Sequence, residues 1–290
     1  MLPELQHGGV SVTAPHRIQW TEPTPIDASN AQHSGCAVLL QGPSGSGKTH
    51  FVASMPHPIV VGVTESNISV YVGRIAEGAA ITLFPLRSWA DYQWFVRKTK
   101  NREWDASTVA LDSYTVAGGF CVDSAMARPG SLTKDGMLQQ TQWNRVKSEQ
   151  FDELLDLLGS IQPAAGKPSY NIVVTVHEQD EAIYGTGTDG SRVVTGISAV
   201  NPAVPGGLRG HFGAKFDCVF ITASQTLMTA DANKIQRPSG VRHFMWTVNP
   251  DHLRKTKDGL GGNGGRKALP PQVENTWRAL QAAWTNTEEK

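Results

Sequence analysis

The chain has 290 residues, enough for one large α/β domain or two small ones, and 39% of them are hydrophobic, which supports a substantial core. The 26 basic and 26 acidic residues cancel, so the overall charge excludes a general affinity for polyanions, and any nucleic-acid surface has to be a local patch. No secretory signal is visible, and no apolar run approaches the roughly 20 residues of a membrane span. We therefore expect a soluble, cytoplasmic protein with no membrane partner.

The three cysteines, Cys36, Cys121 and Cys218, are odd in number and widely spaced. Neither a zinc-binding spacing nor a disulfide framework is present. We predict three buried thiols in a reducing compartment, because free cysteine behaves as a small apolar residue.

The order of the elements predicts one α/β domain over residues 36–290, preceded by an N-terminal arm or irregular lead-in over residues 1–35. Apolar runs predict strands at 36–40, 59–63, 81–84, 108–111 and 172–176, and helices are predicted at 47–54, 88–98 and 142–158. The helix over 142–158 is expected to present one broad apolar face formed by Trp143, Val146, Phe151, Leu154, Leu155 and Leu158. Further along, the pattern predicts a hairpin at 181–194, strands at 218–221 and 243–247, a flexible glycine-rich loop at 259–265 and a helix at 273–284. The expected fold is a mostly parallel central sheet flanked by helices, with C-terminal antiparallel additions.

A glycine-rich loop connects the first predicted strand to the first predicted helix. It consists of Gly42, Pro43, Ser44, Gly45, Ser46, Gly47, Lys48 and Thr49. Glycine lets the backbone curl so that N–H groups converge on phosphate oxygens, and the following helix adds its N-terminal dipole. In this pattern Lys48 reaches the β- and γ-phosphates and Thr49 ligates Mg²⁺. The loop therefore predicts a P-loop nucleoside triphosphatase.

Two acidic residues follow predicted strands and belong to the same edge of the sheet. Asp112 ends the strand at 108–111 and fits the position that holds Mg²⁺ through water; otherwise it is a strand-end residue that caps a turn. The next residue is Ser113 and not a catalytic glutamate, so the carboxylate that activates water has to come from elsewhere. Glu65, two residues beyond the strand at 59–63, is the candidate for this role; the alternative is a solvated loop residue.

These features resemble the RecA-like branch of P-loop ATPases. In that family the magnesium strand ends in Asp-Ser, as Asp112-Ser113 does, and the catalytic glutamate follows the strand after the phosphate-loop helix, as Glu65 does. The family also has a polar sensor at the end of the next core strand, where this chain has His177. RecA has glutamine there, so His177 departs from the pattern; the alternative is a strand-end histidine with no such role.

The resemblance also extends to a basic stretch after residue 250. Lys255 and Lys257 resemble the paired lysines that RecA-type filaments place in the ATP site of a neighbouring subunit, and a solvated basic turn is the competing interpretation. Alternate residues of an extended segment point the same way, so both lysines are able to face one γ-phosphate. Arg254, Arg266 and Lys267 are candidates for an arginine finger or for contacts with a nucleic-acid backbone.

More narrowly, the chain is similar to compact phage-encoded RecA-like ATPases, also described as phage nucleotide-binding or AAA-family proteins, some of which assist single-strand annealing and recombination. The resemblance covers about residues 36–271 and rests on the loop at 42–49 and on residues 63–65, 110–113, 174–177, 216–219 and 266–270. It implies DNA-contacting loops, for which the candidates are residues 127–136, with Arg128 and Lys134, and residues 184–192, with Tyr184 and Arg192. An ordinary surface hairpin is the competing interpretation of the second segment.

The leading hypothesis is an oligomeric ATPase that uses ATP and Mg²⁺ and acts on single-stranded DNA in phage recombination or replication, in the cytoplasm of the host cell. The resemblance implies self-association into a ring or filament, with a phage single-strand-binding or annealing protein as a further partner. The alternatives are a packaging or helicase-loading type of motor or assembly factor, and a small-molecule kinase. Adenine rather than guanine is implied by the resemblance, and the absence of an Asn-Lys-x-Asp motif agrees with it.

Overall fold

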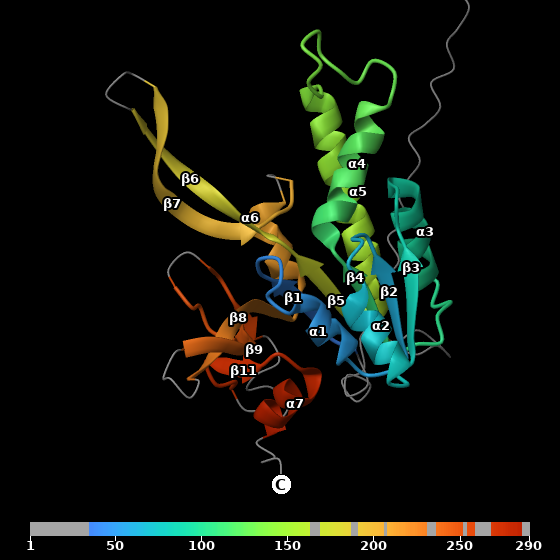
Figure 1. Cartoon of the computed structure of the whole chain (residues 1–290). Coiled ribbons are helices and arrows are strands. Elements are labelled where there is room, and N and C mark those ends of the chain that lie inside the picture. The colour runs from blue at the N-terminus through green and yellow to red at the C-terminus, as the bar shows by residue number, and fades with distance from the viewer. Residues whose placement is uncertain are drawn as a thin grey trace, which may run out of the picture. The chain divides into compact units, whose positions relative to one another are not determined.

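The computed structural model describes residues 35–162, 169–186, 191–205, 208–230, 236–251, 254–258 and 268–285 (Figure 1). Most of the predicted arm, the glycine-rich loop at 259–265, Arg266 and Lys267 lie outside the described residues. The predicted division at residues 35 and 36 therefore stays a prediction.

A nine-stranded sheet forms the centre of the fold, in the order β11-β9-β8-β1-β5-β4-β2-β3, with β10 paired to β8. The parallel part contains β1 (Ala37–Gln41), β2 (Ile59–Val63), β3 (Ile81–Pro85), β4 (Thr108–Asp112), β5 (Asn171–Val176) and the start of β8 (Cys218–Ala230). The antiparallel part contains the rest of β8, β9 (Gln236–Trp246), β10 (Lys257–Asp258) and β11 (Gln272–Glu274). This arrangement confirms the predicted fold class.

Helices cover both faces of the sheet, and alternate strand residues face the two layers. On one face, Ala37 and Leu39 of β1 join a buried cluster that includes residues of α3 (Trp89–Lys100), α4 (Tyr114–Met126), α5 (Gln140–Leu158) and α6 (Arg209–Phe212). On the other face, Val38 and Leu40 join a cluster with α1 (Lys48–Ala53), α2 (Ser69–Ala76) and α7 (Trp277–Thr285). Two short 3₁₀ helices, Gly159–Ile161 and Gly213–Lys215, complete the set that is described. All three cysteines are buried, as predicted.

The structure differs from the sequence prediction at four helices. Neither α2 nor α4 was predicted, because glycine inside each segment and β-branched residues weaken the helical signal. Leu155 of α5 is 40% exposed, so it does not belong to the predicted apolar face. The last helix begins at Trp277, because Val273 instead pairs with Met245 as part of β11. The helix after residue 88 is confirmed, and the Ser88 hydroxyl caps it by accepting a bond from the Asp91 N–H at 3.2 Å.

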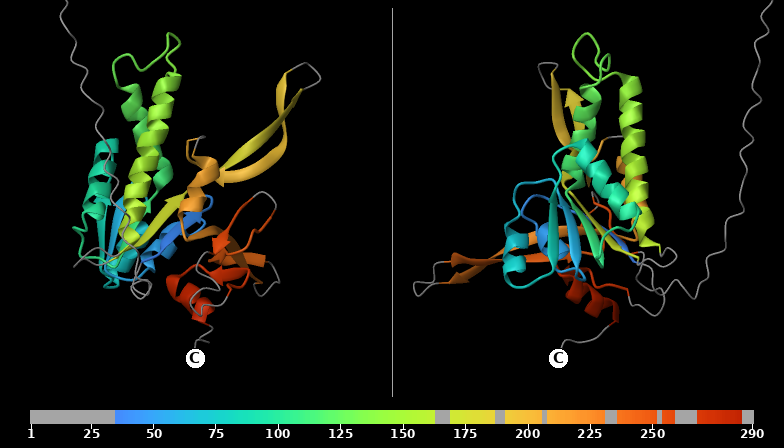
Figure 2. Two further views of the ribbon diagram at one scale, coloured as in Figure 1. Left: turned by 180° about the vertical axis from the view of Figure 1, so that it is seen from behind. Right: turned by 90° about the vertical axis from the view of Figure 1, so that its right-hand side faces the viewer.

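Two long antiparallel ribbons extend from the sheet (Figures 1 and 2). The first, β6 (Glu178–Thr186) with β7 (Arg192–Pro202), confirms the predicted hairpin and is longer than expected. The second is formed by β8 and β9, which the sequence predicted only as short strands. Both ribbons expose apolar side chains, including Tyr184, Val194, Met228 and Val241. Among the described residues, no helix is both long and apolar enough to cross a membrane.

Candidate nucleotide-binding site

The strands that carry the predicted site residues end at the same edge of the sheet. Gln41 of β1 lies opposite Val176 of β5, and Val63 of β2 lies opposite Asp112 of β4. The phosphate loop, Glu65, Asp112 and His177 therefore leave the sheet at one level. Topology alone brings together residues that are more than 130 positions apart in the sequence.

The loop at 42–49 has the backbone that its glycines predict. Gly45 and Gly47 have φ angles of 76° and 98°, which side chains disfavour, and Gly47 directly precedes α1. Gly42 is required for a different reason: a Cβ there would lie 2.4 Å from the Thr222 hydroxyl. That hydroxyl is 2.6 Å from the Ser46 Oγ and donates to the Gln41 carbonyl at 3.2 Å. Thr222 of β8 thus fixes the start of the loop.

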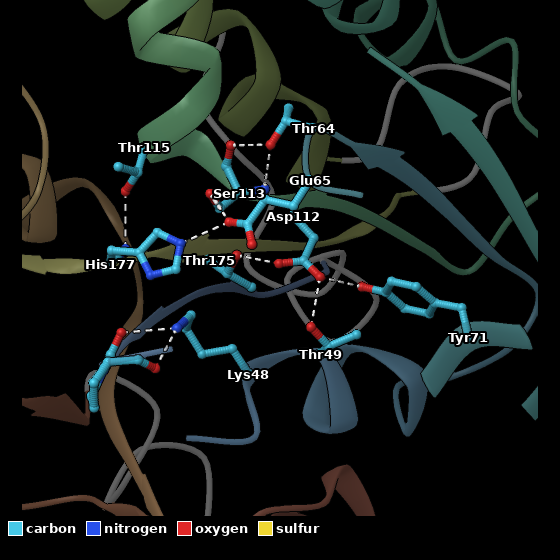
Figure 3. A network of polar contacts seen from close by, with 12 residues as sticks. Lys48, Thr49, Thr64, Glu65, Tyr71, Asp112, Ser113, Thr115, Thr175 and His177 are labelled. Carbon is cyan, nitrogen blue, oxygen red and sulfur yellow. Dashed lines mark hydrogen bonds and ion pairs between the residues drawn. The ribbon is translucent and has the colours of Figure 1, made fainter. Parts of the chain in front are cut away.

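The Lys48 ammonium lies inside the loop. It donates to the carbonyl oxygens of Gly42 and Pro43, both at 2.8 Å (Figure 3). Burial lowers the pKa of Lys48, while the nearby carboxylates of Asp112 and Glu65 act in the opposite direction. Because its hydrogen bonds among the described residues go to neutral carbonyls, this buried cation is suited to an anionic ligand.

Asp112 is buried and accepts hydrogen bonds from three hydroxyl groups (Figure 3). Its Oδ2 accepts from Thr49 at 2.9 Å and from Tyr71 at 2.8 Å, and its Oδ1 accepts from Thr175 at 2.6 Å. The contact between Thr49 and Asp112 joins the two residues predicted to serve Mg²⁺. Carboxylate and hydroxyl oxygens with room for water are the ligand set that this hard cation prefers.

Glu65 lies beside them and is half-exposed (Figure 3). Its Oε1 is 2.7 Å from the His177 Nε2 and accepts from the Ser113 hydroxyl at 2.7 Å. The bond from His177 is the main reason that the pKa of Glu65 falls from 4.5 to about 2, with further contributions from Ser113 and Lys48. Glu65 is therefore ionised at neutral pH. Its two hydrogen-bond partners, Ser113 and His177, directly follow the strands β4 and β5.

The loop and the two acids line a cavity of about 240 Å³. Its walls include Gly45, Lys48, Thr49, Glu65, Asp112 and His177. The positive-φ glycines, the carbonyl-bound lysine and the acid–hydroxyl pair on one wall fit a triphosphate with Mg²⁺.

A second cavity of about 360 Å³ adjoins the first, and His50 and His243 line both. The two imidazole rings stack with centroids 5.0 Å apart. Arg74, Glu274 and Asn275 also line the second cavity. Burial is the largest cause that lowers the pKa of His50, followed by repulsion from His243 and Arg74. This stacked aromatic pair beside the phosphate loop offers a flat surface for a heterocyclic base.

Several residues that shape this site were not predicted. Asn275 is 2% exposed and donates from Nδ2 to the Gly47 carbonyl at 2.6 Å, which connects the chain just before α7 to the phosphate loop. The hydroxyl groups of Tyr71 and Thr175 donate hydrogen bonds to Asp112, and the hydroxyl of Thr222 donates to the Gln41 carbonyl at the start of the loop. Of these residues, only Thr175 could have been found from the sequence, because it lies two residues before His177 on a strand whose end was predicted to belong to the site.

Arg254, Lys255 and Lys257 do not line the phosphate cavity of this chain. Lys255 and Lys257 line a separate cavity of about 500 Å³ between β7 and α6, and neither lines the phosphate cavity. Lys257 donates to the Phe216 carbonyl at 2.6 Å. Arg254 forms ion pairs with Glu178 at 2.8 Å and with Asp251. A role for the lysines in a neighbouring subunit stays a prediction.

The two segments predicted to contact DNA are placed as follows. Arg128 pairs with Glu149 at 3.1 Å, while Lys134 is exposed in the connection between α4 and α5. At the end of the β6–β7 ribbon, the Arg192 guanidinium lies 3.7 Å from the centre of the Tyr184 ring. These two residues form an exposed cation–aromatic pair.

Comparisons with known proteins identify the family. The family model described as AAA domain matches residues 34–257. Among solved structures, the chain is similar to a prototypical ATPase from the type III secretion system of pathogenic bacteria, with 14% identity, a TM-score of 0.38, and coverage of 65% of this chain and 52% of that chain. The chain thus spans about half the length of that ATPase, and no curated protein matches it. Because the family match covers most of its length, the chain belongs to the AAA domain family.

Proposed function

We propose that the protein is a Mg²⁺-dependent ATPase that self-associates into a ring or filament and acts on single-stranded DNA, in a phage recombination or replication role. The observation that carries the ATPase part is the assembly of Lys48, Thr49, Asp112 and Glu65 around one cavity. The triphosphate would bind over the loop amides, and the base would enter the adjoining cavity against His50 and His243.

Each residue has a distinct part in the proposed reaction. Thr49 and Asp112 would hold Mg²⁺, which neutralises charge on the phosphate oxygens when it is bound. Lys48 would exchange its carbonyl bonds for β- and γ-phosphate oxygens. Glu65 orients a water whose oxygen attacks the γ-phosphorus; the water's proton passes to Glu65 as the bond to the ADP oxygen breaks.

Glu65 requires one rearrangement before it can act. A carboxylate with a pKa of about 2 is a weak base, and its Oε1 is occupied by Ser113 and His177. Loss of the His177 contact would raise the pKa of Glu65 and free the oxygen for water. Because β6 begins at Glu178, directly after His177, movement of the β6–β7 ribbon is a way to control this contact.

The single-stranded DNA part is supported by the exposed Tyr184–Arg192 pair on that ribbon. An aromatic face stacks on any base, and a guanidinium pairs with phosphate, so this combination suits binding without sequence preference. The chain's balanced charge agrees with a short, local contact. The phage assignment, the ring or filament, the paired lysines across an interface and a single-strand-binding or annealing partner rest on the resemblance to RecA-like proteins.

Phosphate release from ATP tests this proposal. We expect activity that requires Mg²⁺, rises with single-stranded oligonucleotide and falls steeply on dilution, with duplex of the same length as control. Activity that is flat in both tests would remove the DNA and assembly parts and leave the ATPase.

A motor or assembly factor that grips protein is the second candidate. The exposed apolar side chains of the β6–β7 ribbon, which include Ile183, Val194 and Ile197, favour it. Stimulation of phosphate release by a protein substrate and not by DNA would select this alternative.

A further inference from the structure

Among the described residues, Tyr71 is the one aromatic residue that forms a hydrogen bond with Asp112. Its ring is fully buried in the cluster that contains α1 and α7, and its hydroxyl donates to the Asp112 Oδ2 at 2.8 Å (Figure 3). The hydroxyl has no role in packing that a phenylalanine ring would not fill. Its placement therefore calls for an explanation in terms of Asp112.

The acceptor capacity of Asp112 supplies that explanation. An ionised carboxylate offers about four lone-pair positions. Thr49, Tyr71 and Thr175 occupy three of them. Among these contacts one position is left, which a water bound to the cation would use.

Tyr71 differs from the other two donors in where it comes from. Thr49 belongs to the phosphate loop and Thr175 to β5, whereas Tyr71 lies on α2, six residues after Glu65. The Tyr71 hydroxyl thus ties the segment that follows the proposed catalytic carboxylate to the acid on the neighbouring strand β4. No sequence motif assigned this residue.

We propose that Tyr71 is a positioning residue that orients Asp112, so that this acid meets the bound cation through water at a single remaining acceptor position. This inference rests on the proposed ATPase function. Residues that form a hydrogen bond with a metal ligand, without touching the metal, change metal affinity by about 10- to 100-fold when they are removed. The same order is expected here, because the cation would depend on Asp112 for its outer contacts.

The experiment compares Tyr71→Phe with Tyr92→Phe. Tyr92 is a matched control, because it is also fully buried and its hydroxyl has no hydrogen-bond partner among the described residues. The measurement is binding of a fluorescent, non-hydrolysable ATP analogue during a Mg²⁺ titration, with a second series in chelator. Thermal melting of each variant is recorded alongside.

For Tyr71→Phe we expect the Mg²⁺ concentration at half-saturation to rise about 10-fold, with the affinity in chelator unchanged. Tyr92→Phe should match the wild type in both series. Adding Tyr71→Phe to Asp112→Asn should cause no further shift, because the hydroxyl acts through the carboxylate.

An unchanged Mg²⁺ titration in folded Tyr71→Phe would overturn the inference. It would also be overturned if Tyr71→Phe were unfolded while Tyr92→Phe stayed folded, because the Tyr71 hydroxyl would then serve stability. An equal additional shift in the Asp112→Asn background would also overturn it. Failure of the wild type to bind the analogue at all is a different result, and it would contradict the proposed function itself.

Discussion

The two parts of the sheet carry different parts of the site. The parallel strands β1, β2, β4 and β5 end in the groups proposed to act on phosphate, metal and water. The antiparallel strands contribute supports: Thr222 of β8 holds the start of the phosphate loop, and Asn275, directly after β11, holds its end. Mutation of Glu65 in the parallel part should therefore affect hydrolysis, whereas mutation of Asn275 in the antiparallel part should affect nucleotide binding.

The largest effect is expected in the parallel part. Glu65→Gln should bind ATP normally and hydrolyse it at least about 100-fold more slowly, a typical loss for a general base. Phosphate release and nucleotide binding, measured on the same preparation, check this. Glu181→Gln on the exposed β6–β7 ribbon is the control, and it should keep wild-type turnover; near-normal turnover in Glu65→Gln would refute its assignment.

In the antiparallel part, Asn275→Ala should weaken nucleotide binding about 10-fold, because the buried Gly47 carbonyl loses a donor and the loop loses a support. The rate constant for hydrolysis at saturating ATP should change little. Equilibrium binding and a saturation curve separate the two quantities. A large loss in the maximal rate with unchanged affinity would contradict a purely supporting role.

The Tyr184 side chain on the β6–β7 ribbon should affect only the response to DNA. Removing the stacking ring in Tyr184→Ala should reduce affinity for single-stranded DNA about fivefold, in the range of one lost base contact. Basal phosphate release without DNA should be unaffected. Fluorescence anisotropy with a labelled oligonucleotide measures the change, and Ile183→Ala on the same ribbon serves as the control.

The smallest effect concerns pH and the contact between His177 and Glu65. This contact is the largest cause that lowers the pKa of Glu65 from 4.5 to about 2, so its contribution to stability is present above pH 4.5 and is lost as the pH falls toward 2. The difference in melting temperature between wild type and His177→Ala should therefore shrink below pH 4.5. The side chain is half-exposed, so the difference is expected to be small; a difference independent of pH would contradict the assignment.

Sequence patterns predicted the parallel part almost residue by residue, because apolar runs mark buried strands and the glycine-rich loop is specific. The same patterns did not predict α2, and with it Tyr71, because a short segment with an internal glycine carries little helical signal. Asn275 was equally hidden, since its contact with Gly47 spans 228 positions and depends on how β11 pairs with β9. Local sequence patterns predict which residues lie at the end of a strand. Which distant residues contact those strand ends depends on long-range pairing, which local patterns do not contain.

Equilibrium binding of ATP to wild type and to Lys48→Ala tests the central claim most directly, with Lys255→Ala as the matched control. Lys48 lines the phosphate cavity and Lys255 lines a separate one. We predict Mg²⁺-dependent binding in the wild type and in Lys255→Ala, and a loss of at least about 10-fold in Lys48→Ala, since hydrogen bonds to charged groups contribute about 1.5–3 kcal/mol each. Equal binding by all three proteins, or none by the wild type, would contradict a triphosphate site at residues 42–49.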